Sequence, residues 1–446
     1  MGSILLTNGK IVNEGRVFWG NILIVDEFIA KIDINPIEVP KNCEVIDVKG
    51  SFVLPGIIDD QVHFREPGLT HKGDIESESK AAVAGGITSF IEQPNTVPNA
   101  ISQEILANKF EIAAQKSFAN YSFMMGGTNT NLEEILKTNP KNVAGLKLFL
   151  GSSTGNMLVD NMQSLEAIFK STKLLIAVHC EDETTIKNNL KKYTAQFGDA
   201  IPVSKHPLIR SEEACYLSSS KTVALAKKTG ARLHVFHIST AKELTLFDNT
   251  RPVFEKQITC EVCVHHLNFS DADYQTKGNF IKWNPAIKTQ ADQDALWNGL
   301  NNDIIDVIAT DHAPHTLEEK LNNYLNAPSG GPLVQHALVA LMENHLKGKI
   351  TIEKMVEKMA HNPALIFKIQ KRGFIKEGYY ADLVVVNPNE SWTVDKNNLL
   401  YKCGWSPFEG TTFKSKISHT FVNGVLVYQS GKPIEIKNGK RLLFER

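Results

Sequence analysis

Hydrophobic residues in the middle of the chain occur in short runs that alternate with stretches of helical periodicity. Runs of about 4–8 apolar residues between turn signals are typical of strands buried on both faces of a sheet. Eight such runs occur, and they predict a TIM (β/α)8 barrel of the α/β class. The expected strands are Val53–Ile58 leading to His63, Ile87–Ile91, Tyr121–Met125, Gly145–Leu150, Leu174–Val178, Leu233–Phe236, Ile258–Val264 and Ile304–Ile308.

Segments with helical periodicity separate most of these runs. The other fold with this alternation is a doubly wound parallel sheet. It is the less favoured alternative because no Gly-rich phosphate loop follows any strand, and Gly151–Gly155 matches neither GxGxxG nor a P-loop. The expected helices cover residues 76–84, 103–116, 161–170, 212–229 and 291–300.

Both ends of the chain are rich in short β-strand patterns instead. The N-terminal part holds the runs Ile4–Thr7, Ile22–Val25 and Val45–Val48. In the C-terminal part, Asn423-Gly424 lies between two apolar runs and predicts a two-residue hairpin turn. Neither end has enough strands to bury a core alone, so we expect one small composite β-sandwich built from both termini. The predicted domains are residues 1–52 and 373–446 for the sandwich and 53–372 for the barrel.

Composition and charge narrow the function classes. The chain has 446 residues, with Lys+Arg 48 against Asp+Glu 49 and a net charge of -1 at pH 7. This balance argues against nucleic-acid binding, which rests on excess positive charge. The sequence contains no signal-peptide pattern and no run of ~20 apolar residues, so we expect a cytoplasmic protein with no membrane segment.

The six cysteines are scattered, as is typical of reduced thiols. Cys260 and Cys263 form a CxxC, but it lies inside an apolar run and no second CxxC accompanies it. We therefore interpret both cysteines as residues of a core strand rather than as a zinc ribbon or a redox motif.

Potential metal ligands follow several of the expected strands. In a TIM barrel, catalytic residues lie at the carboxyl ends of the strands, and His63, His179, His237 and Asp311 all stand at such ends. One buried histidine alone is usually a core residue, but His and carboxylate donors converging on one rim are what Zn²⁺ requires. Lys147 stands inside an apolar strand, where an unpaired ammonium is costly. Carboxylation into a metal ligand and an ion pair with a strand-end Asp are the two interpretations.

With these motifs in place, the chain resembles the dihydroorotases of the amidohydrolase superfamily. The resemblance implies a barrel with a composite β-sandwich, a metal centre, and interconversion of N-carbamoyl-L-aspartate and L-dihydroorotate in de novo pyrimidine (UMP) biosynthesis. The segments that carry it span nearly the whole barrel in the family's order: Pro55–Asp59, His63–Gly68, Ala84–Thr88, Gln93–Thr96, Gly145–Phe149, His237–Thr240 and Ala309–His315.

The resemblance also implies roles for single residues. His63 is a ligand of the first metal ion, His179 and His237 hold the second, and Lys147, carboxylated by CO₂, bridges the two. Asp311 is both a ligand and the catalytic base. The positions that match the family's substrate-binding residues are Arg65, Asn95 and His315 for a carboxylate and Asn284 for the ring, while the pair His265-His266 is expected to be structural.

One position departs from the family pattern. Gln61 replaces the first histidine of a His-x-His motif, and an amide oxygen is a weaker zinc ligand than an imidazole. We therefore expect one tightly bound Zn²⁺ and a second that is weak. Two alternatives stay open: another cyclic-amide hydrolase (dihydropyrimidinase, hydantoinase or allantoinase), or an inactive dihydroorotase-like partner of a transcarbamoylase. The sequence indicates neither a homodimer nor a partner enzyme directly, and the loop 317–332 is a candidate cover for the substrate.

Overall fold

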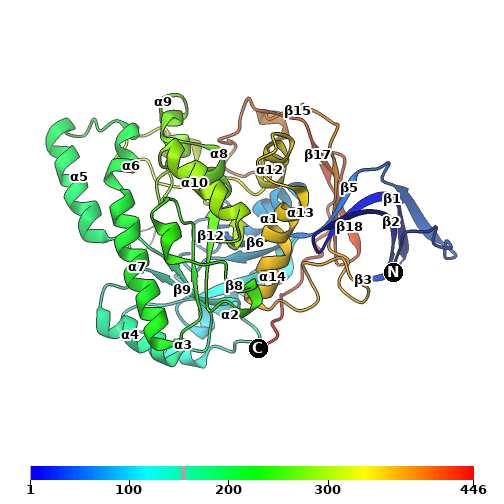
Figure 1. The fold of residues 1–446 in the computed structure, drawn as a ribbon, viewed down its shortest axis with the longest axis horizontal. Coiled ribbons are helices and arrows are strands. Elements are labelled where there is room, and N and C mark those ends of the chain that lie inside the picture. Colours follow the sequence, from blue (N-terminus) through cyan, green and yellow to red (C-terminus); the bar gives the residue numbers. More distant parts are fainter. Residues whose placement is uncertain (1, 152–156) are drawn as a thin grey trace.

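The predicted hydrophobic runs form eight parallel strands, nearly all of whose residues are buried. In the computed structural model, which describes residues 2–151 and 157–446, these strands form the barrel at the centre of Figure 1. Most of the segment Gly151–Gly155 lies outside the described residues. The barrel strands are β6 (Ile57–Val62), β7 (Ile87–Glu92), β8 (Asn120–Gly126), β9 (Gly145–Phe149), β10 (Ile176–His179), β11 (Leu233–Val235), β12 (Ile258–Cys263) and β13 (Val307–Ala309).

The barrel closes where its first strand meets its last. Val62 at the end of β6 pairs in parallel with His312, just beyond β13. The His63 N–H donates to the His312 carbonyl at 2.7 Å. The Thr310 hydroxyl donates to the Asp59 carboxylate at 2.6 Å, and the Thr310 N–H donates to the same carboxylate at 3.2 Å. These bonds place the ends of β6 and β13 side by side, although the rest of the barrel separates them in sequence.

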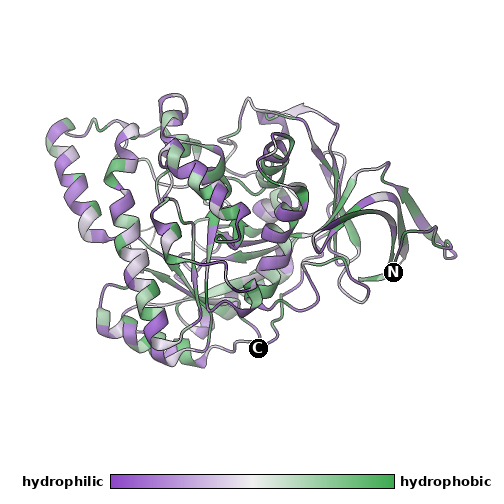
Figure 2. Cartoon of the chain, viewed as in Figure 1, coloured by the Kyte–Doolittle hydropathy of each residue, from purple (hydrophilic) through white to green (hydrophobic). Residues whose placement is uncertain are grey.

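Helices cover the outside of the barrel, and Figure 2 shows hydrophilic and hydrophobic residues on alternate faces of several of them. Local sequence sets the limits of α7: the Ser211 side chain accepts a hydrogen bond from the Ala214 N–H, and left-handed Gly230 ends the helix. No helix within the described residues is both long and apolar enough to span a membrane. The helices are α1 (Ile75–Ala84), α2 (Gln103–Lys116), α3 (Leu132–Lys137), α4 (Met162–Ser171), α5 (Glu183–Phe197), α6 (His206–Ile209), α7 (Glu212–Thr229), α8 (Val264–Asn268), α9 (Tyr274–Lys277), α10 (Gln290–Asn301), α11 (Leu317–Lys320), α12 (Ala337–Leu346), α13 (Ile352–Val356) and α14 (Asn362–Phe367).

A separate sheet is built from both ends of the chain, as predicted, and lies beside the barrel in Figure 1. The two ends meet at one strand, because Val53 pairs with both Ile11 and Val385. The sheet strands are β1 (Ser3–Asn13), β2 (Arg16–Val25), β3 (Phe28–Asp33), β4 (Cys43–Asp47), β5 (Phe52–Pro55), β14 (Leu383–Asn387), β17 (Lys416–Val422), β18 (Val425–Gln429) and β19 (Lys432–Pro433), and β15 (Trp392–Thr393) pairs separately with β16 (Thr412–Phe413).

The predicted first barrel strand, Val53–Ile58, is in fact two strands of different sheets. Residues before Gly56 belong to β5 of the separate sheet, and residues after it belong to β6 of the barrel. Gly56 is the residue at which the chain passes from one sheet to the other. A side chain at this position would collide with Thr88, because Thr88 Oγ1 lies 2.0 Å from the position that a Cβ would take. An apolar run shows burial but not which sheet buries it. The exact domain boundaries stay a prediction.

The predicted turn at Asn423-Gly424 is confirmed. Val422 pairs with Val425, so the loop between β17 and β18 has two residues, and both have positive φ (49° and 74°). This conformation favours Asn and Gly. Gly424 also packs closely, because an added Cβ would lie 2.0 Å from the Asp26 carbonyl oxygen. The turn therefore needs glycine for conformation and for space.

We expect Gly424→Ala to destabilise the protein by roughly 2–5 kcal/mol, because it adds a backbone collision to the cost of a left-handed residue. Gly230→Ala is the matched control: its φ is 73°, and no atom lies within 4 Å of the added Cβ. That variant should lose only about 1–2 kcal/mol. Chemical denaturation of the three proteins measures the difference. Equal losses would show that the close contact with Asp26 is unimportant.

Candidate metal centre and active site

The carboxyl ends of the barrel strands surround a cavity, as is general for this fold. Phe149, Trp283, Ser329 and Gly330 form part of its wall, so the loop 317–332 reaches the cavity. Eight of the residues predicted from the sequence also line it: Gln61, His63, Arg65, Lys147, His179, His237, Asn284 and Asp311.

Two of the predicted ligands, His179 and His237, face each other. His179 ends β10 and His237 follows β11, and the distance from His179 Nδ1 to His237 Nε2 is 3.0 Å. Burial lowers the pKa of both imidazoles, so both are neutral and carry a lone pair. Two nitrogens bound to one tetrahedral zinc at ~2.0–2.1 Å lie about 3.3 Å apart. This pair of donors therefore fits a single zinc ion.

A second pair of donors lies across the seam of the barrel. His63 Nε2 is 3.2 Å from an oxygen of Asp311, and His63 Nδ1 is 2.8 Å from the side-chain oxygen of Asn95. Because the amide oxygen can only accept, His63 carries its proton on Nδ1, which leaves the Nε2 lone pair directed toward Asp311. Burial, with smaller contributions from Arg65 and Lys147, lowers the pKa of His63 well below its usual value. The neutral ring suits metal binding.

Lys147 is almost fully buried on β9 with its amine against aromatic rings. Its Nζ lies 3.9 Å from the centroid of the Phe236 ring and 5.0 Å from that of Phe149. Within the described residues no carboxylate forms an ion pair with it, so the predicted alternative of an ion pair with a strand-end Asp is not what the structure has. Burial lowers the pKa of Lys147 to about 7 and raises that of Asp311 to about 7. A neutral amine is the form that can react with CO₂.

Gln61, the residue that replaces a histidine, does line the cavity. Its side-chain oxygen accepts a hydrogen bond from the Cys263 thiol, with a distance of 3.7 Å from Sγ to Oε1. The side-chain oxygen of Gln61 therefore interacts with β12 at the wall of the cavity.

Arg65 and His315 form a small group beside these donors. The Arg65 guanidinium donates to the Pro314 carbonyl at 3.0 Å and lies 3.1 Å from His315 Nε2. Lys72 lies on the other side of the His315 ring, with its amine 3.0 Å from Nδ1. Burial lowers the pKa of Arg65 to about 10, so it remains charged at neutral pH. His315 is thus placed behind Arg65.

Asn95 and His315, predicted to bind the substrate carboxylate, are absent from the described lining of the cavity. Asn95 contacts His63, and His315 contacts Arg65. Their direct contact with a substrate stays a prediction, and the structure places both as supports for other site residues.

Three site residues have strained backbones. Arg65, His237 and Asp311 have φ values of 71°, 39° and 47°, in the left-handed region that non-glycine residues seldom adopt. Each lies just after a barrel strand. Such strain clusters at functional sites, where the surrounding structure holds it in place.

Two residues near the site were not identified from the sequence. Glu181 lies 3.1 Å from His179 Nε2 and also pairs with Arg210. Burial opposes its ionisation, but Arg210 and His179 lower its pKa to about 2. A carboxylate two positions after a predicted ligand is a usable signal for such a partner. Lys72 had no comparable signal, since nothing in its local sequence relates it to His315.

His265 and His266, expected to be structural, are buried in the first turn of α8, behind the cavity wall. The His265 ring stacks on Trp283, with centroids 4.5 Å apart and planes inclined by 15°. Burial lowers the pKa of His265 well below its usual value and that of His266 to about 3, so both rings are neutral.

We expect Asn95→Ala to weaken zinc binding about 10–100-fold, because it removes the acceptor that fixes the orientation and tautomer of His63. Asn284→Ala is the matched control. Asn284 lines the same cavity. Its side-chain oxygen has no hydrogen-bond partner within the described residues, so it does not orient a predicted ligand. Competition with a chelator measures both affinities. Unchanged affinity in Asn95→Ala would contradict the supporting role.

Comparisons with known proteins agree with this geometry. Residues 52–427 match the model of the "Amidohydrolase family". The dihydroorotase of Pyrococcus furiosus is 32% identical over 441 residues, covering 98% of this chain and 96% of that protein. The dihydroorotase of Carboxydothermus hydrogenoformans is 34% identical over 435 residues, covering 96% and 98%.

Among solved structures, the L-hydantoinase (dihydropyrimidinase) of Arthrobacter aurescens superposes with a TM-score of 0.93 at 25% identity, covering 99% of this chain and 100% of that one. The dihydropyrimidinase of Brevibacillus agri gives a TM-score of 0.88 at 23% identity and shares the fold. The family model and the curated relatives cover nearly the whole chain, and the barrel rim gathers the ligand types expected of them. The chain belongs to the amidohydrolase family and is a hydrolase related to the dihydroorotases.

Proposed function

We propose that this chain is a zinc-dependent dihydroorotase that interconverts N-carbamoyl-L-aspartate and L-dihydroorotate in de novo pyrimidine (UMP) biosynthesis. The relatives named dihydroorotase support the substrate. The converging His, Asp and Lys side chains support metal-assisted hydrolysis of a cyclic amide.

Arg65 is the observation that favours a substrate with a carboxylate. Its charged guanidinium lies in the cavity wall, two positions beyond His63, and no carboxylate within the described residues forms an ion pair with it. Asp311, Glu92 and other carboxylates act on this buried cation only from beyond ion-pair distance. A bound carboxylate would pair with it directly through two hydrogen bonds. Dihydroorotate and carbamoyl aspartate carry this carboxylate, whereas dihydrouracil does not.

Asn284 and Asp311 would act on the ring itself. The side-chain oxygen of Asn284, which has no hydrogen-bond partner within the described residues, can accept a ring N–H. In ring opening, water attacks the amide carbonyl, and Asp311 takes the proton from the water and delivers it to the leaving nitrogen. Ring closure reverses these transfers. Zinc bound at this rim would lower the pKa of the water and polarise the carbonyl.

We infer that the two zinc positions differ in strength. His179 and His237 would supply two imidazoles to one position, and Lys147, once carboxylated, would supply oxygen ligands to the site. The other position has His63 and Asp311, with Gln61 in place of a second imidazole. Nitrogen donors hold zinc more tightly than a neutral amide oxygen, so the position held by His179 and His237 is the tight one.

The two alternative functions, a hydantoinase-type hydrolase and an inactive partner of a transcarbamoylase, explain fewer of the residues that line the cavity. A hydantoinase, as the similar solved structures are named, opens a ring that does not require a carboxylate, so Arg65 would have no partner. An inactive partner of a transcarbamoylase would not need His63, Lys147, His179, His237 and Asp311 to converge on one rim. A homodimer is compatible with this proposal but is not needed for it.

We expect turnover of dihydroorotate and little turnover of dihydrouracil or allantoin. Arg65→Met should lower kcat/KM for dihydroorotate by a factor that corresponds to about 2–4 kcal/mol of lost transition-state stabilisation, because a charged hydrogen-bonded pair is lost. Arg65→Lys is the matched control and should recover part of this loss, since it keeps the charge but not the paired geometry. Steady-state kinetics with metal analysis of each variant gives the measurement. Turnover of dihydrouracil at the same rate as dihydroorotate would contradict the assignment.

Replacing Gln61 with histidine should strengthen the weaker zinc position. We expect Gln61→His to retain up to one more zinc per chain after mild chelation, because an imidazole joins His63 and Asp311. Metal analysis after graded chelation, with Gln61→Asn as a control that keeps an amide, provides the comparison. Two equally tight catalytic zincs in the natural chain, unchanged by Gln61→His, would refute the unequal positions. Absence of metal and of turnover when zinc is supplied would favour the inactive partner.

A further inference from the structure

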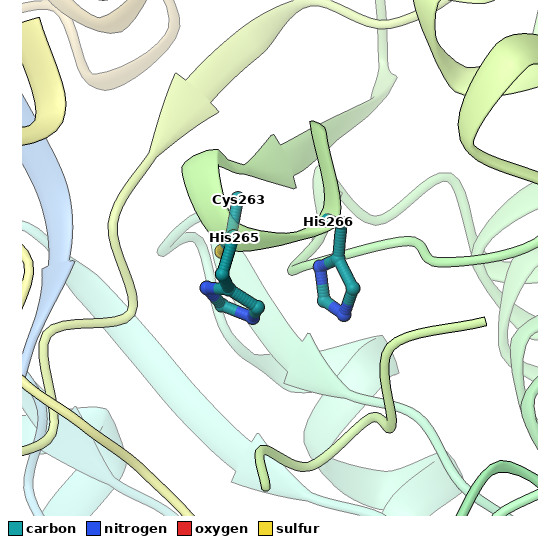
Figure 3. Close-up of side chains that lie close together, drawn as sticks. All are labelled: Cys263, His265 and His266. Atoms are coloured by element: carbon teal, nitrogen blue, oxygen red, sulfur yellow. The ribbon is translucent and has the colours of Figure 1, made fainter. Parts of the chain in front are cut away.

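A cluster of metal-type donors lies outside the catalytic ligand set, at the end of β12. Cys263 is the last residue of this strand, and His265 and His266 lie in the first turn of α8. All three side chains are buried, and one potential ligand atom of each lies within 4.8 Å of the other two. Figure 3 shows the two imidazole rings side by side near the thiol.

Among the described residues, three nitrogen atoms of the two rings have no hydrogen-bond partner. His266 Nε2 lies 3.2 Å from the Pro285 carbonyl and therefore carries the proton, which leaves a lone pair on a buried Nδ1 without a partner. Within the described residues neither nitrogen of His265 makes a hydrogen bond of good geometry, and the nearby Thr310 backbone only partly opposes the lowering of its pKa by burial. Buried polar atoms without partners are rare and require an explanation, such as an ion.

The position of the proton on His266 is typical of a metal ligand. A histidine that binds a metal usually donates its other ring N–H to a carbonyl or carboxylate, which fixes the ring. The contact between His266 and Pro285 has this form, with the free nitrogen on the side of the cluster that faces the other donors.

A second group of three donors in the barrel does not call for an ion. His234 Nε2 lies 3.3 Å from Asp60 and 3.2 Å from Glu261, and its other nitrogen lies 2.7 Å from the Thr259 hydroxyl. A charged imidazole already neutralises carboxylates in that group. The Cys263 cluster contains no acidic side chain, and within the described residues both nitrogens of His265 and Nδ1 of His266 have no hydrogen-bond partner.

The donor types select the ion. A thiolate with two imidazoles suits Zn²⁺, whereas Mg²⁺ and Ca²⁺ prefer oxygen. Beside the cluster, the side-chain oxygen of Gln61 lies 3.7 Å from the Cys263 sulfur. Since Gln61 also lines the catalytic cavity, an ion would enter from that side.

We propose that Cys263, His265 and His266 form a separate structural zinc site behind the catalytic cavity. Binding replaces the thiol proton by zinc, and the proton leaves to solvent. The site would fix the adjoining loop, because His265 stacks on Trp283 and His266 bonds to Pro285. Trp283 and Asn284 of this loop line the catalytic cavity.

Cobalt substitution tests the site independently of turnover. The metal-free full chain is loaded with Co²⁺ alone, and its near-ultraviolet spectrum is recorded, since thiolate ligation to Co²⁺ gives a charge-transfer band that nitrogen and oxygen ligands do not. We expect a band from one thiolate per chain. Cys263→Ser should abolish it, and His265→Gln should weaken cobalt binding at this site at least 10-fold.

Two controls separate this site from other thiols and from the catalytic ligands. Cys260→Ser removes a buried thiol of the same strand, whose sulfur contacts the Ile304 carbonyl, and should leave the band unchanged. A double variant, His179→Ala with His237→Ala, should lose catalytic metal and keep the band. The proposal is overturned if the natural chain shows no band, if Cys263→Ser retains it, or if the double variant loses it. Lack of dihydroorotase activity with an intact band would refute only the proposed function.

Discussion

The catalytic cavity depends on closure of the barrel between β6 and β13. The pairing of Val62 with His312 and the bonds from Thr310 to Asp59 bring the first and last strands together. His63 approaches Asp311 only because these strands meet, so half of the candidate metal centre exists only in the closed barrel. Parallel strands also direct all their carboxyl ends to one rim, which explains why ligands from distant segments converge without a dedicated scaffold.

Burial at this rim then sets the protonation states. Removal from water keeps His179 and His237 neutral and favours the uncharged amine of Lys147, and these are the forms that bind metal or react with CO₂. Arg65 keeps its charge under the same conditions because its ordinary pKa is so high. The same desolvation therefore produces neutral ligands and one fixed cation, a combination that suits a metal beside an anionic substrate.

The strand pattern and the positions of the candidate ligands at the strand ends could be predicted from the sequence because periodicity and strand direction are local properties. The break at Gly56 could not, since an apolar run does not reveal which sheet buries it. The support roles of Asn95 and His315 could not be predicted either. They arise because His63 and Arg65 line the cavity and contact these two residues, and such contacts depend on the distances between strands. Lys72 could not be predicted because only tertiary packing brings it to His315, whereas Glu181 lies two positions after His179 and could have been predicted from that spacing.

The sheet shared by the two ends of the chain has a consequence for synthesis on the ribosome. β5 emerges early, but the edge that pairs with β14 stays uncovered until residues 383–387 have been made. An open strand edge can pair with other chains. The whole barrel is translated during this interval and can fold before the sheet is complete. The edge of β5 is therefore open to pairing with other chains throughout synthesis of the barrel, and β14 closes it.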